Sequence, residues 1–168
     1  SVARLYVAHT WTLNTWVHLA ITRSGNDLKF YVDGVQVGTT QDCTGVSYDG
    51  GTEPLKIGLL TNGWMKEVRI SNSARTVSVP TAQYASDANT KLLMHFDTPA
   101  TSPLAPAIAF DGTGDYLSLA DHADWDLSGN FTVEWWERRN ALGNGQTAIA
   151  RGYTAGGVQP YSFGYESS

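Results

Sequence analysis

The sequence predicts an all-β fold, an antiparallel two-sheet β-sandwich of the jelly-roll kind. Apolar and polar residues alternate with period two through about a dozen short segments. Turn residues separate these segments roughly every 8–12 positions, as in sandwich folds. No window of helical periodicity extends beyond about two turns, so helices are not expected to form the core.

The composition supports this class and excludes several functions. Only 16% of the 168 residues are charged and 17 are glycine, a balance typical of β-rich chains with many turns. The formal net charge of −5 argues against nucleic acid as a partner, because few cations are present to neutralise phosphates. No apolar run is long enough to span a bilayer, so no membrane insertion is expected. Cys43 stands alone and forms no internal disulfide.

The clearest local signal is a three-stranded meander, expected at residues 16–23, 27–33 and 35–39. Asp33 and Gly34 separate its last two strands. An Asp-Gly pair between two apolar runs favours a type I′ turn, in which both central residues have positive φ. Further strands are expected at residues 55–59, 64–70, 91–96, 107–110, 115–119, 131–138, 146–151 and 160–166. Residues 98–106 contain three prolines and are expected to form a linker.

Several of these segments resemble laminin-G-like domains of the concanavalin A superfamily. Residues 16–34 are similar to the central hairpin of that family, and residues 63–75 are similar to its closing strand. Residues 110–117 and 131–136 are similar to its opening strands. The resemblance implies one laminin-G-like sandwich over residues 1–168. Lys66 departs from the pattern, because the family usually has an acidic residue at this position.

The order of the segments is reversed relative to that family. We expect a closing half (1–85), a linker with one strand (86–106) and an opening half (107–168). Two explanations remain open: a circular permutation, or one period cut from a tandem array. In either case the halves should close on each other, with Tyr161 to Glu166 beside Val2 to His9 in a strand–turn–strand junction.

No catalytic motif is present, and we expect that the protein is not an enzyme. A glycoside hydrolase needs two carboxylates flanking the scissile bond. Glu134 and Glu137 are separated by an odd number of residues, so they should point to opposite faces of their strand. The pair Glu134 and Glu67 remains open.

Candidate ligand-binding residues are aromatic. If Phe131, Val133 and Trp135 face the core, Trp136 lies on the other face among polar neighbours, as a sugar-stacking ring would. The other candidates are Trp64, before the closing strand, and Tyr31 and Lys29 on the hairpin. The alternative is that Trp136 packs under a loop or against a neighbouring subunit.

Metal binding has a weaker basis. Five acidic residues lie between Asp111 and Asp126, in a solvated loop or around a hard cation such as Ca²⁺. The family resemblance implies Ca²⁺ ligands at Asp111 and Asp115, with Asp33 as a further candidate. The alternative is that Asp111 and Asp115 only shape a turn.

The function expected from these observations is recognition without catalysis. We expect a carbohydrate- or receptor-recognition module of a larger extracellular or virion-surface protein, such as a phage tail or capsid-decoration protein, or an adhesin. Its partner would be a cell-surface glycan. The alternative is a purely structural module that assembles with neighbouring subunits or with copies of itself.

Overall fold

The computed structural model describes residues 3–4, 9–48, 52–96, 107–142, 146–152 and 161–165. Within these residues the chain forms two β-sheets, which confirms the predicted sandwich. The smaller sheet has the order β1 (Ala3–Arg4), β12 (Tyr161–Tyr165), β11 (Gln146–Arg151), β5 (Leu55–Ile57) and β9 (Leu117–Leu119). The larger sheet has the order β4 (Val35–Asp42), β3 (Asp27–Val32), β2 (Trp16–Ser24), β10 (Phe131–Arg139), β6 (Asn62–Ser71) and β7 (Thr90–Met94), while β8 (Ile108–Asp111) also pairs with β6.

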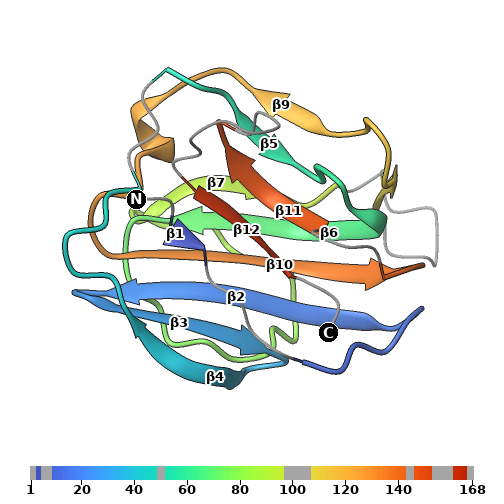
Figure 1. Ribbon diagram of the computed structural model, residues 1–168, viewed down its shortest axis with the longest axis horizontal. Coiled ribbons are helices and arrows are strands. Elements are labelled where there is room, and N and C mark those ends of the chain that lie inside the picture. The colour runs from blue at the N-terminus through green and yellow to red at the C-terminus, as the bar shows by residue number, and fades with distance from the viewer. Residues whose placement is uncertain are drawn as a thin grey trace.

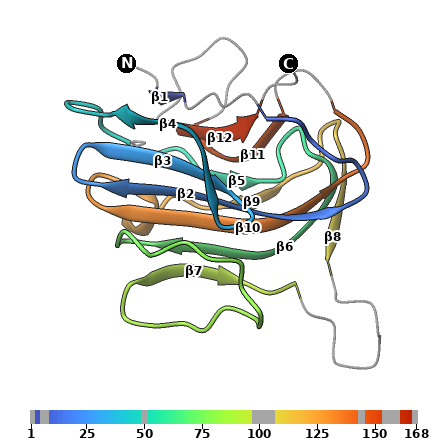
Figure 2. The ribbon, with the colours of Figure 1, turned by 90° about the horizontal axis from the view of Figure 1, so that it is seen from below.

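Figure 1 shows β10 lying between β2 and β6 in the larger sheet, and in Figure 2 β11 and β12 lie on the opposite side of the molecule from β6 and β7. A short 3₁₀-helix, η1 (Ala123–Trp125), precedes β10. No helix in the described part of the chain is long and apolar enough to cross a membrane.

The predicted meander is confirmed as β2, β3 and β4. Asp33 and Gly34 join the last two strands with φ values of 47° and 76°, as a type I′ turn requires. The side chain of Asp33 also accepts a hydrogen bond from the backbone N–H of His18 at 2.8 Å. The turn is therefore held to the strand that lies beside it.

The two sequence halves meet inside the larger sheet. β10, from the second half, pairs along its length with β2 on one side and with β6 on the other, both from the first half. β8 is also from the second half and pairs with the start of β6. Residues 97–106, which include the proline-rich linker, lie outside the described residues.

The predicted junction between the ends of the two halves is partly wrong. Ala3 and Arg4 lie beside Tyr161 and Ser162, so the expected segments are neighbours where the structure describes them. The pairing is parallel, however, whereas a strand–turn–strand unit makes antiparallel neighbours. Parallel neighbours need a longer crossover connection, so these strands do not form a hairpin.

The core lies between the two sheets. Alternate side chains of β10 point into it, and Phe131, Val133 and Trp135 are all at most 1% exposed. Across the core, Ile149 and Phe163 of the smaller sheet are also buried. This confirms the predicted parity of β10, and it places Trp136 on the face that points away from the core.

A bulge in β6 adjusts this alternation. Glu67 has a positive φ of 50°, and the β6–β10 register shifts between Glu134 and Trp136. Met65 and Val68 both point into the core although they are three residues apart, because the bulge adds one residue to the strand. As a result Lys66 lies opposite Trp136.

Gly58 has no room for a side chain. Gly58 has a φ of 82°, and a methyl group added there would overlap the ring of Phe110. We expect Gly58→Ala to destabilise the protein by about 2 kcal/mol or more, because left-handed strain and overpacking add. Gly129→Ala is the matched control: an added methyl has nothing within 4 Å there, and φ is not positive. Chemical denaturation measures both, and equal effects of the two substitutions would contradict the prediction.

Candidate functional site

The outer face of the larger sheet, which points away from the core, gathers aromatic and cationic side chains at one end. Cross-strand pairs align Trp136 with His18 and Lys66, and Arg138 with Trp16 and Trp64. Directly opposed side chains on one face lie about 5 Å apart at Cβ. These pairs define a two-by-three array, here called the tryptophan face: Trp16, His18, Lys66, Trp64, Trp136 and Arg138.

Lys66 lies over two of the tryptophan rings. Its Nζ is 4.5 Å from the ring centroid of Trp16 and 5.7 Å from that of Trp136. Both distances fall within the range of a cation–π interaction. The residue that departs from the family pattern therefore contacts two of the three tryptophan rings of this face.

The rings differ in exposure. Trp64 is 38% exposed, whereas Trp16 and Trp136 are half-buried. The ring of His18, which is fully buried, packs against Trp136 with 5.5 Å between centroids. The tryptophan face thus combines partly accessible ring surface with a buried histidine ring that packs against Trp136.

The structure brings together only some of the predicted ligand residues. Trp136 and Trp64 are diagonal neighbours on the tryptophan face. Tyr31 and Lys29 are also on the outer face, but they lie beside Ala20 and Thr22 on the far side of β2. They form a separate half-exposed pair on β3.

Trp16 was not among the predicted ligand residues, although a signal for it was present. Val17, Leu19 and Ile21 are apolar and alternate with Trp16 and His18. Where the apolar residues face the core, strand parity places Trp16 and His18 on the opposite face. What parity could not show is that β10 and β6 bring Trp136 and Trp64 alongside.

Residues 72–89, here called the strap, lie over the part of the outer face around Thr132 and His18. Thr132 of β10 accepts a hydrogen bond from the backbone N–H of Arg75 and donates one to the carbonyl of Ser73, both at 2.8 Å. Farther along the strap, Tyr84 is 7% exposed and its hydroxyl lies 2.8 Å from Nε2 of His18. Side-chain bonds therefore attach the strap to β10 and β2.

Glu134 and Glu67, the pair of carboxylates left open for catalysis, lie under this strap. Glu134 is 4% exposed and binds Arg69, whose Nη2 is 2.6 Å from Oε1. Glu67 accepts a hydrogen bond from the backbone N–H of Tyr84 at 2.9 Å and lies 2.8 Å from Nδ1 of His95. The two carboxylates thus hold the strap and its neighbours.

The protonation of Glu134 follows from these contacts. Burial by itself would raise its pKa, but contact with His18 and the charge and hydrogen bond of Arg69 outweigh burial, so the pKa lies below the ordinary value of 4.5. A general acid of a glycoside hydrolase needs the opposite shift. Glu134 is therefore poorly suited to protonate a leaving group.

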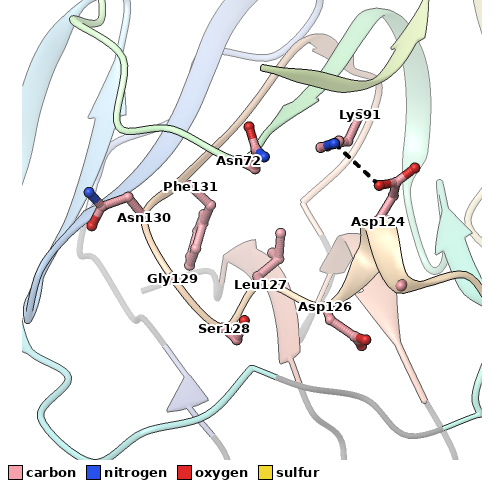
Figure 3. A pocket seen from close by; sticks show the side chains of 10 residues that line it. Asn72, Lys91, Asp124, Asp126, Leu127, Ser128, Gly129, Asn130 and Phe131 are labelled. Atoms are coloured by element: carbon pink, nitrogen blue, oxygen red, sulfur yellow. Dashed lines mark ion pairs between the residues drawn. The ribbon is translucent and has the colours of Figure 1, made fainter. Parts of the chain in front are cut away.

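A pocket of about 370 Å³ lies at another place, where the end of β6 and β7 meet η1 and the start of β10. Figure 3 shows Lys91 and Asp124 side by side, and their ion pair spans 3.5 Å. Phe131 and Leu127, which line it, belong to the buried core. Its charged groups already face one another or, like Asp126, bind Arg151. The pocket offers polar walls but little accessible aromatic surface.

The predicted metal residues form a turn. The backbone N–H of Thr113 donates to Asp111 at 2.7 Å, and the N–H of Asp111 donates to Asp115 at 3.4 Å. In the described part of the chain no group of three or more His, Cys, Asp or Glu side chains could hold a metal ion. Because Ca²⁺ takes six to eight oxygen ligands, these two carboxylates by themselves do not make a ligand set.

The comparison with known families agrees with the fold. Residues 3–78 match a laminin-G-type family model described as the concanavalin A-like lectin/glucanases superfamily. Together with the two-sheet architecture, this match supports a laminin-G-like, concanavalin A-like domain. No curated protein and no solved structure matches the chain. Laminin-G-like domains are generally non-catalytic, but the superfamily also includes glucanases.

The lowered pKa of Glu134 predicts a pH effect on stability. The unfolded chain binds a proton at Glu134 more tightly than the folded protein does. The stabilisation from its ionised form is thus complete above about pH 4.5 and is lost as the pH falls through the folded pKa. Thermal melts at decreasing pH should show a steeper loss for the wild type than for Glu134→Gln. The exposed Glu53→Gln is the control and should keep the wild-type slope; a wild-type slope in Glu134→Gln would refute the prediction.

A calcium titration tests Asp111 and Asp115. Neither residue belongs to a group of three or more possible ligands among the described residues, so we expect the same melting temperature with CaCl₂ and with a chelator. A rise with CaCl₂ that disappears in Asp111→Asn would instead establish a calcium site.

Proposed function

We propose that this domain is a non-catalytic carbohydrate-recognition module and that its ligand stacks on the tryptophan face. The observation that carries the proposal is the gathering of Trp16, Trp64 and Trp136 on one face of the larger sheet. Sugars present apolar C–H faces between hydroxyl groups, so they suit an apolar ring flanked by hydrogen-bonding side chains. Lys66 and Arg138 supply such groups beside the rings.

The positions of the carboxylates support recognition without hydrolysis. Glu134 is buried and ionised beside Arg69, and Glu67 binds the backbone of the strap. Neither arrangement leaves a proton donor and a nucleophile facing a common cleft, as glycoside hydrolysis requires. These contacts favour a structural role for both residues.

The setting we propose is a larger extracellular or virion-surface protein with a cell-surface glycan as partner. It rests on the family resemblance alone, and fold by itself does not define function. The competing proposal is assembly with a neighbouring subunit through the same tryptophan face, since exposed aromatic patches also mark protein interfaces.

A glycan array with the wild type, Trp136→Ala and Trp64→Ala tests the proposal. We expect glycan binding by the wild type and a loss of about tenfold or more in each variant, the effect of removing an aromatic anchor of about 1.4 kcal/mol or more. Tyr116→Ala is the matched control, because Tyr116 is 43% exposed, lies away from this face and also carries a lysine over its ring.

The outcomes separate the two proposals. If the wild type binds no glycan but self-associates, and Trp64→Ala abolishes the association in light scattering, the assembly proposal replaces this one. Equal losses in Tyr116→Ala and Trp136→Ala would show that the tryptophan face is not the site.

A further inference from the structure

Lys66 covers the ring surface that a sugar would use. Its ammonium lies within cation–π distance of Trp16 and Trp136 at the same time. A ligand that stacks on these rings must displace this ammonium. Both cation–π interactions of Lys66 are then lost, unless the ligand forms a new contact with the ammonium. The ammonium of Lys66 therefore competes with a stacking ligand for the rings of Trp16 and Trp136.

The charge around Lys66 is locally positive on a chain with a formal net charge of −5. Arg138 is its diagonal neighbour on β10. Neither cation forms an ion pair with any residue that the structure describes, and Nε of Arg138 is buried with no hydrogen-bond partner there. Among the described residues, the two cations of the tryptophan face thus have no ion-pair partner.

Glu67 and Glu134, the carboxylates nearest to Lys66 and Trp136 along the strands, bind other residues. Glu67 follows Lys66 in the chain but binds His95 and the backbone of Tyr84. Glu134 precedes Trp136 by two positions on the same face but binds Arg69 under the strap. A ligand carboxylate can therefore pair with Lys66 without displacing any carboxylate of the described residues.

We propose that Lys66 is a specificity-determining residue that selects acidic saccharides, meaning sugars that carry a carboxylate. A sugar carboxylate attracts the ammonium away from the two indole rings, forms a charge-assisted hydrogen bond with it and so opens the stacking surface. A neutral sugar only displaces the ammonium. This inference rests on the proposed function, because it requires that a saccharide stacks on the tryptophan face.

The experiment is a glycan array printed in pairs, each uronic- or sialic-acid glycan beside its carboxyl-reduced counterpart. The two members of a pair differ in charge and share their stacking surface. We expect the wild type to bind the acidic member about tenfold more tightly than the reduced one, as a charge-assisted contact predicts. The preference should weaken as salt concentration rises.

Lys66→Met is the decisive variant, because methionine keeps an apolar stem and removes the ammonium. We expect Lys66→Met to bind both members of each pair equally, with binding to the reduced member equal to or stronger than that of the wild type. Lys56→Met is the matched control, since the ammonium of Lys56 lies 4.8 Å from the Tyr116 ring, away from this face. It should keep the wild-type preference.

Three results would overturn the inference. If the wild type binds both members equally and Trp136→Ala abolishes both, the proposed function stands while the selection of acidic sugars fails. If Lys66→Met keeps the acidic preference, another residue causes it. If the wild type binds no glycan at all, this inference and the proposed function fail together.

Discussion

The structure depends on β10, a strand from the second half of the chain that lies between two strands of the first half in the larger sheet. β10 pairs with β2 over eight positions and with β6 along its other edge. Without β10 these two strands would each expose a row of unpaired backbone groups, and Trp135 would be missing from the core. The pairing of β10 also forms the outer face. Trp136 follows Trp135, so its side chain points outward, between the side chains of β2 and β6. Core and candidate site thus depend on the same backbone pairing.

The bulge at Glu67 adapts β6 to this arrangement. The bulge places Glu67 in the left-handed region of φ, which is unfavourable for a residue with a Cβ. In return, Met65 and Val68 both reach the core, and Lys66 comes to lie opposite Trp136. The carboxylate of Glu67 also binds the strap through the backbone of Tyr84. One irregular residue therefore connects the placement of Lys66 with the attachment of the strap.

The buried polar groups under the strap have a structural explanation. His18, Glu134, Arg69 and Tyr84 are in mutual contact. Burial and the nearby charge of Glu134 also raise the pKa of Tyr84, so its hydroxyl keeps its proton. Such groups are costly to bury alone but are stable when they satisfy one another.

Local pattern predicted much of this protein. The Asp33–Gly34 turn, the strands beside it and the inward direction of Trp135 all follow from short stretches of sequence, because turn geometry and strand parity are local properties. The match to residues 3–78 is likewise carried by the sequence. The strap, the parallel pairing of β1 with β12, the neighbours of Trp136 and the position of Lys66 over two rings were not predictable in this way. They depend on which distant strands become neighbours and in what register, and that is decided by burial across the whole core. The sequence by itself therefore determined the class of fold and the face on which Trp136 lies, and only the tertiary structure decided what lies beside it.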